Sequence, residues 1–112
     1  MAIPTITGRQ SANNEALYFI EGYLSERGMH IYRTEHDGYG ALVATTKQTK
    51  TPRVMLAGHI DVVDGSPALF TMREENGKIY GRGVWDMKCA IAAYMIAVDE
   101  LRDSLGDYDF GV

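Results

Sequence analysis

The sequence of 112 residues lacks features that disulfide-stabilised, nucleic-acid-binding, membrane-spanning and secreted proteins require. It holds one cysteine, so no internal disulfide can form, and we expect a reducing, cytoplasmic compartment. Lysine and arginine together number 11 against 15 acidic residues, and the net charge of -4 argues against nucleic acid or an acidic membrane as a partner. No apolar run is long enough to span a bilayer, and the N-terminus lacks the features of a secretory signal. The length allows one hydrophobic core.

The apolar pattern that is present predicts helices alternating with strands. Ala16, Leu17, Ile20 and Leu24 recur at helical spacing, with N-cap candidates at 11–14 and a stop at Gly28. The other expected elements are strands at 29–35, 41–46 and 54–60, a hairpin at 70–83 turning on Asn76-Gly77, a helix from Met87 to Leu105 ended by Gly106, and a strand beginning at 107–112. This alternation predicts an α/β fold.

The stretch RVMLAGHIDVVDG, residues 53–65, combines an apolar run with two polar side chains. The run predicts a strand buried on both faces, and His59 and Asp61 lie at its carboxyl end, where α/β sheets bind ligands. Because strand residues alternate, both side chains would share one face. A carboxylate that holds one imidazole nitrogen leaves the other free for a metal. The alternative is a buried histidine whose hydrogen bonds Asp61 satisfies.

A second stretch, YGRGVWDMKCAIAAYMIA at 80–97, places two glycines and then Asp86 before an apolar helix. Asp86 could be only the N-cap of that helix. The glycines indicate a close approach of the backbone or a positive φ, which a simple cap does not explain. A dinucleotide-binding fingerprint is excluded, since the third glycine and the strand–turn–helix context are missing.

GHIDVV at 58–63 and GRGVWDMK at 81–88 together resemble one family of two-zinc enzymes. It is the family of amidohydrolases and exopeptidases that includes acetylornithine deacetylase, succinyl-diaminopimelate desuccinylase, carboxypeptidase G and the aminoacylases. The order of elements is similar too, and the resemblance extends over the chain to IPTITG at 3–8. It implies an α/β catalytic domain with a mixed sheet and flanking helices, of which residues 1–112 are the N-terminal part.

The resemblance implies a role for each motif residue. His59 would be a zinc ligand, Asp86 would bridge two zinc ions, and Asp61 would be the catalytic-site residue that supports His59. Cobalt or manganese could replace zinc in the complete protein, and we expect metal binding by this chain alone to be weak or absent. The substrate would be a small peptide or an N-acyl amino acid, cleaved at an amide bond. The family also implies a cis peptide between Asp86 and Met87.

The chain departs from the family in three places. Cys89 and Ala90 stand where two small residues, commonly glycines, follow the aspartate motif, and we expect Cys89 to be a small buried residue. The short loop at 62–70 lacks the tryptophan segment of the desuccinylases, which weakens a specific desuccinylase assignment. The family's consecutive glutamates, which follow a strand like the one that begins at Asp109, are not found in these residues, nor are its later acidic and histidine ligands or its lid or dimerisation domain.

These departures predict that the chain alone does not catalyse the reaction of the complete protein. They also leave two alternatives, a non-catalytic domain on a peptidase scaffold that acts by protein association, and an unrelated α/β binding module. We expect a homo-oligomer, because an unpaired strand edge and an apolar helix face both favour self-association.

Overall fold

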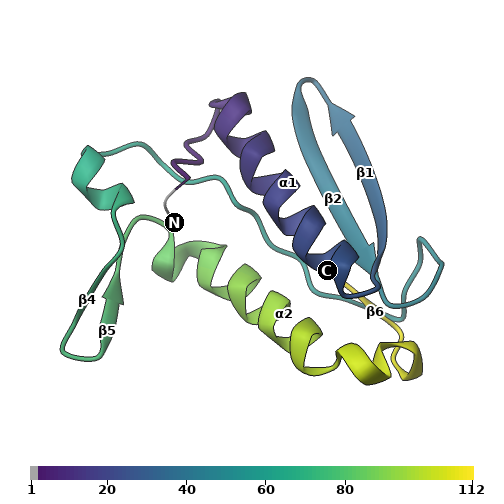
Figure 1. Cartoon of the computed structure of the whole chain (residues 1–112). Helices are drawn as coiled ribbons and strands as arrows, with labels where there is room; N and C mark the ends of the chain where they lie inside the picture. The colour runs from purple at the N-terminus through teal and green to yellow at the C-terminus, as the bar shows by residue number, and fades with distance from the viewer. Residues whose placement is uncertain (1–2) are drawn as a thin grey trace.

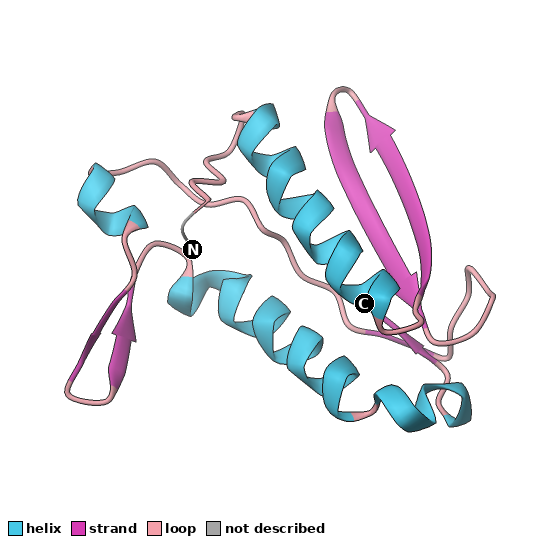
Figure 2. Ribbon diagram, viewed as in Figure 1, coloured by secondary structure: helices cyan, strands magenta, loops and turns pink. Residues whose placement is uncertain are grey.

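A four-stranded mixed sheet organises residues 3–112, which the computed structural model of the chain describes (Figures 1 and 2). Its strands are β1 (His30–His36), β2 (Tyr39–Thr45), β3 (Val54–Met55) and β6 (Phe110–Gly111). The order is β1-β2-β6-β3, in which β6 runs antiparallel to β2 and parallel to β3. Two helices, α1 (Gln10–Glu26) and α2 (Cys89–Glu100), accompany the sheet, and β4 (Arg73–Glu75) and β5 (Lys78–Tyr80) form a separate hairpin. The expected mixed α/β architecture is confirmed.

The first helix ends where the sequence predicts and begins earlier than it predicts. Gly28 has φ +85°, and the N–H groups of Gly28 and Met29 donate to the carbonyls of Ser25 and Leu24 at 3.0 and 3.2 Å. This is the Schellman arrangement that a glycine after the last turn allows. At the other end α1 begins at Gln10, so the predicted N-caps at 11–14 are wrong. They lie inside the first turns, and no side chain caps the helix.

Two hairpins turn on two-residue loops, each made of an aspartate or asparagine followed by a glycine. Asp37 and Gly38 connect β1 to β2 with φ of 51° and 79°, and Asn76 and Gly77 connect β4 to β5 with φ of 52° and 70°. Positive φ at both loop residues is the type I′ geometry that suits the twist of paired strands. The predicted hairpin on Asn76-Gly77 is confirmed.

The strand predicted at 54–60 and buried on both faces is wrong in extent and burial. Only Val54 and Met55 pair as a strand, at the edge of the sheet, and they are 54% and 44% exposed. An apolar segment is buried only where other elements cover it. Here β6 gives β3 two paired positions, and residues 57–61 continue without a strand partner among the described residues.

The second helix is shorter than predicted. α2 ends at Glu100, and a tighter 3₁₀ turn at Arg102–Asp107 follows, so the predicted end at Gly106 is wrong. Leu101, at the junction, takes a conformation outside the α-helix. Within residues 3–112 no helix has the length and apolar character needed to cross a membrane.

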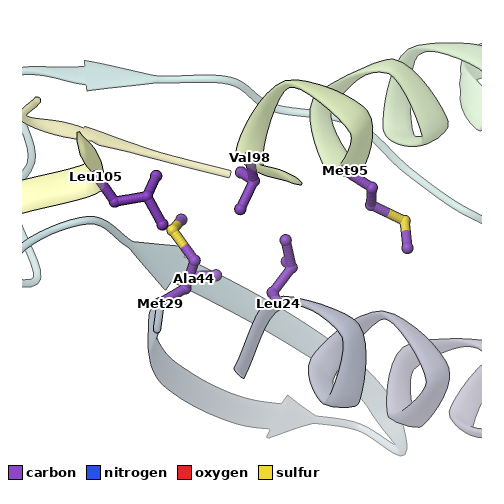
Figure 3. Packing of buried hydrophobic residues seen from close by; sticks show 6 residues of the cluster. All are labelled: Leu24, Met29, Ala44, Met95, Val98 and Leu105. Carbon is purple, nitrogen blue, oxygen red and sulfur yellow. The ribbon is translucent and has the colours of Figure 1, made fainter. Parts of the chain in front are cut away.

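The core lies where the C-terminal ends of both helices meet β2. Figure 3 shows its members: Leu24, Met29, Ala44, Met95, Val98 and Leu105. The predicted helical faces supply four of them, since Leu24 comes from the first face and Met95, Val98 and Leu105 from the second. At the surface of this junction Arg27 Nε donates to Asp99 Oδ1 at 2.7 Å, which joins the end of α1 to α2.

Candidate metal site

The three predicted site residues come together from two separate segments. His59 and Asp61 lie on the extended segment that follows β3, which passes between α1 and α2 in the view of Figure 1. Asp86 lies in the distorted turn Val84–Lys88 that leads into α2. His59 Nε2 is 3.4 Å from Asp86 Oδ1, and His59 Nδ1 is 3.1 Å from Asp61 Oδ1. All three side chains are between 41% and 60% exposed, so solvent reaches the site.

The surroundings of the His59 ring favour a proton on Nδ1. Nδ1 lies 3.1 Å from the backbone carbonyl of Asp61 and 3.1 Å from its carboxylate. A carbonyl oxygen can only accept a hydrogen bond, and an ionised carboxylate likewise. Nδ1 must therefore donate. Nε2 faces the acceptor Asp86 Oδ1 at 3.4 Å, so this nitrogen would either carry a second proton or offer its lone pair to a metal ion. This is the arrangement found behind metal-binding histidines.

Asp61 is itself held by a residue that sequence reasoning did not single out. Thr7 Oγ1 donates to Asp61 Oδ2 at 2.7 Å, so the carboxylate uses one oxygen for the histidine and the other for the threonine. The N-terminal segment reaches this place because Ile6 forms a parallel bridge to Val62. The alternating threonines of IPTITG were the available signal, since a short β-like segment there presents Thr5 and Thr7 on one side.

The turn that carries Asp86 depends on a close approach at Gly83. This glycine has φ +82°, and a Cβ placed there would lie 2.8 Å from both Val62 Cγ1 and Lys88 Cδ. A larger residue would push the Asp86 turn away from the segment that carries His59. Gly83 of GRG therefore has both the positive φ and the close approach that the sequence indicated.

The predicted cis peptide between Asp86 and Met87 is wrong, because no cis peptide occurs within residues 3–112. The chain instead reverses direction with Met87 at φ 56°, while Asp86 is extended at φ −104° and ψ 94°. Asp86 is not the N-cap of α2 either, since Lys88 holds that position and no side chain caps the helix.

The His59–Asp86 pair has the spacing of two ligands of one metal ion. Zinc binds nitrogen and oxygen at about 2.0–2.1 Å, so two ligands on one edge of a tetrahedron are about 3.3 Å apart. The observed 3.4 Å agrees with that edge. Asp61 is turned toward the far side of the ring, and no group of three or more candidate ligands occurs in the described part of the chain. The residues thus fit two ligands of a metal ion and do not complete its coordination.

Cys89, Lys88 and His36 do not act as further ligands beside His59 and Asp86. Cys89 is exposed, so its expected burial is wrong, because it lies on the open side of the first turn of α2. Burial lowers the pKa of Lys88, whose Nζ donates to the carbonyl of Ile3 at 3.3 Å. His36 faces Asp37 at the tip of the first hairpin, where its side chain is 93% exposed.

Known proteins resemble the chain across most of its length. Residues 55–111 match the family described as Peptidase family M20/M25/M40. A succinyl-diaminopimelate desuccinylase of Sulfurovum sp. (strain NBC37-1) is 39% identical over 97 residues, which cover 81% of this chain and 25% of the relative. The corresponding enzyme of Herminiimonas arsenicoxydans is 40% identical over 91 residues, 76% of this chain and 24% of the relative.

A third relative carries a different name. A provisionally named LysW-lysine/LysW-ornithine hydrolase of Thermococcus kodakarensis is 36% identical over 94 residues, 84% of this chain and 24% of the relative. The chain thus spans about a quarter of the length of the relatives it matches. The short loop at 62–70 does not separate it from proteins that bear the desuccinylase name.

Proposed function

Because the chain belongs to peptidase family M20/M25/M40, we propose that it supplies the first part of the metal site of a zinc-dependent amide hydrolase. The substrate class is a small peptide or an N-acyl amino acid. The names of the relatives support this class, since one names the removal of a succinyl group from diaminopimelate and another the hydrolysis of LysW-lysine or LysW-ornithine. Residues 1–112 are then the N-terminal portion of a catalytic domain.

The proposal rests on one observation: the side chains of Asp61, His59 and Asp86 form a line, with His59 in the middle. A buried histidine satisfied by one aspartate, the simpler alternative, does not account for it. The His59 side chain is 50% exposed, and its second nitrogen faces another carboxylate at 3.4 Å. Two carboxylates on opposite sides of one imidazole favour a positive charge there, which a metal ion between the ring and Asp86 would supply in place of a proton on Nε2.

Each residue then has a distinct task. His59 offers the Nε2 lone pair, and Asp61 keeps the proton on Nδ1 and so holds the ring in that tautomer. Asp86 offers two carboxylate oxygens, which suits a bridge between two cations that would otherwise repel each other. Zinc bound there would supply a Lewis acid and a water molecule with a pKa of about 7. Thr7 restrains Asp61 through the 2.7 Å hydrogen bond.

The chain alone holds about half of one coordination sphere, because a zinc site needs about four ligands including water. The family resemblance implies that consecutive glutamates, a general base and a further ligand, follow the strand that begins near Asp109 in a longer protein. Loss of a general base lowers the rate by about 10²–10⁴-fold. We therefore expect the 112-residue chain to show no hydrolysis of N-acyl amino acids or dipeptides, even with added zinc.

A chimera tests the proposal. Residues 1–112 replace the matching quarter of the Sulfurovum desuccinylase, and hydrolysis of its succinylated substrate is measured with added zinc or cobalt. We expect activity that a chelator removes. His59→Ala should abolish it, because that change removes one zinc ligand, whereas His36→Ala at the exposed hairpin tip should leave it unchanged.

Two results would contradict the proposal. One is a folded chimera that binds zinc with equal affinity with and without His59. The other is an active chimera in which His59→Ala and His36→Ala have the same effect. A folded but inactive chimera that does not bind zinc favours a non-catalytic domain that acts by association.

A further inference from the structure

A small cavity of about 280 Å³ lies where three elements meet: the 3₁₀ turn Pro67–Phe70, the open end of the β4–β5 hairpin and the turn Val84–Lys88. Its lining includes Leu69, Arg73, Arg82, Trp85 and Asp86. Pockets that enclose a whole drug-sized ligand have volumes of about 300–1,000 Å³. This cavity therefore suits one chemical group of a larger molecule.

Two contacts hold Arg82 beside this cavity. Its backbone N–H donates to the carbonyl of Leu69 at 2.6 Å, which joins the end of the hairpin to the 3₁₀ turn. Its guanidinium packs against Gly65, where an added Cβ would lie 2.7 Å from Arg82 Nη2. The absence of a side chain at Gly65 therefore leaves the room that the guanidinium occupies, and a larger residue there would displace it.

The Arg82 guanidinium has no anionic partner among the described residues. Nη2 donates to the backbone carbonyl of Asp64 at 3.4 Å, which is a long hydrogen bond to a neutral acceptor. Nε is buried and has no hydrogen-bond partner within residues 3–112. A guanidinium presents its N–H groups as a planar fork that matches a carboxylate, and a buried donor without an acceptor is costly. The unpaired Nε therefore indicates an acceptor that the chain itself does not supply.

A second cation, Arg73, lines the same cavity. It pairs with Tyr80 across the hairpin, and its guanidinium carbon lies 5.0 Å from the centre of the Tyr80 ring, which is a cation–π distance. Neither Arg73 nor Arg82 forms an ion pair in the described part of the chain, whereas three other arginines do. Asp86, the carboxylate in the lining, lies against His59 Nε2 instead, at 3.4 Å. Two guanidinium groups thus line the cavity without a carboxylate partner.

Trp85 adds an apolar surface beside these two cations. Its side chain is 101% exposed, and it is the one tryptophan of the sequence. Tryptophan is usually largely buried, because its ring carries a large apolar area. An exposed indole next to two guanidinium groups suits a ligand that brings carbon atoms together with a negative charge.

We propose that this cavity is a subsite for a carboxylate group of the substrate, with Arg82 as the hydrogen-bond donor. Arg73 supplies a second positive charge, and Trp85 covers the carbon atoms next to the carboxylate. The inference rests on the proposed function, because Asp86 lines the cavity and so places it beside the metal site. The substrate class then narrows to amides that carry an acidic group in addition to the bond that is cleaved, and the hairpin determines that selectivity.

The test titrates the 112-residue chain, without metal, with butyrate and with butyramide, which has a similar shape and no charge. Binding is followed by the fluorescence of Trp85 and by the NMR signal of the Arg82 Nε–H group. We expect butyrate to bind more tightly than butyramide by on the order of tenfold. Arg82→Gln should weaken butyrate binding by on the order of tenfold, and Arg73→Gln by a smaller factor. Arg102→Gln is the control and should leave binding unchanged, because Arg102 is 63% exposed and lies outside the cavity lining.

Equal binding of butyrate and butyramide would overturn the proposal, and so would equal effects of Arg82→Gln and Arg102→Gln in folded chains. If Arg82→Gln does not fold, Arg73→Gln decides, since Arg73 is exposed, and unchanged butyrate binding then overturns the proposal. The readout needs no metal, so it separates the two proposals. A chain that binds butyrate at Arg82 but no zinc at His59 would contradict the metal site and retain the carboxylate site. A chain that binds zinc at His59 but no butyrate would contradict the subsite alone.

Discussion

The packed end of the molecule and the candidate site are held together by different forces. At the packed end Leu24 is 1% exposed and Val98 is 0% exposed, and both contact apolar neighbours (Figure 3). At the site His59 and Asp86 are 50% and 60% exposed, and polar contacts position them. The stability of the chain therefore resides at one end, and the chemistry that the family implies resides at the other.

The difference explains how an exposed site keeps its geometry. Three segments far apart in sequence meet there through a few specific contacts: the Ile6–Val62 bridge, the Thr7–Asp61 hydrogen bond and the close approach at Gly83. Such contacts contribute less to folding than buried apolar area, but they fix the direction of the side chains. Substitutions at the packed end should therefore mainly change stability, and substitutions at the site should mainly change metal binding.

The largest expected effect on stability is at the packed end. Leu24→Ala removes a side chain that is 1% exposed and leaves a cavity, which should lower the free energy of unfolding by about 2–5 kcal/mol. Urea unfolding followed by circular dichroism measures this loss. Ile96→Ala on α2 is the control, since Ile96 is 56% exposed and its loss should change stability by less than about 0.5 kcal/mol. Equal effects of the two changes would contradict the position of the core.

An intermediate effect is expected at Gly83. Gly83→Ala places a side chain at φ +82° and within 2.8 Å of Val62 and Lys88, which should cost about 1–2 kcal/mol or more. Gly106→Ala is the control, because no atom lies within 4 Å of its added Cβ. Thermal unfolding compares the two. A Gly83→Ala chain as stable as the unsubstituted one would show that the segment at 62 and the Asp86 turn do not approach each other closely.

The smallest effect on stability is expected at Thr7. Thr7→Val removes the donor to Asp61 and should lower the free energy of unfolding by about 0.5–1 kcal/mol, while zinc binding weakens because Asp61 is less restrained. Thr7→Ser retains the hydroxyl and should restore zinc affinity. Calorimetric titration measures both. If serine and valine weaken zinc binding equally, the hydroxyl has no positioning role.

Local chemistry made parts of the fold predictable from the sequence. The loop Asn76-Gly77 and the stop at Gly28 both depend on residues that accept positive φ, and the structure has them where the sequence indicates. The helix faces were readable for the same reason, since the spacing that buries Leu24 and Val98 belongs to each helix alone. The family resemblance implied that His59 and Asp86 are ligands of one zinc site, and His59 Nε2 lies 3.4 Å from Asp86 Oδ1.

Features that depend on partners could not be predicted in this way. The apolar run after Arg53 indicated a buried strand, but its burial depends on which elements cover it, and β3 has one neighbour with two paired positions. The backbone at Asp86 and Met87 was expected to be cis, whereas a positive φ at Met87 makes the turn. Thr7 was missed because its role depends on a contact across 54 positions of sequence.

The most direct test of the account is a zinc titration of the 112-residue chain, followed by the imidazole nitrogen resonances of its three histidines. The account predicts that His59 Nε2 shifts first, that Nδ1 keeps its proton toward Asp61, and that His30 and His36 do not respond. Asp61→Asn should weaken this binding by on the order of tenfold, because the ring loses its carboxylate partner. Equal shifts at all three histidines, or a His59 ring that binds zinc through Nδ1, would contradict the arrangement of Asp61, His59 and Asp86 as a metal site.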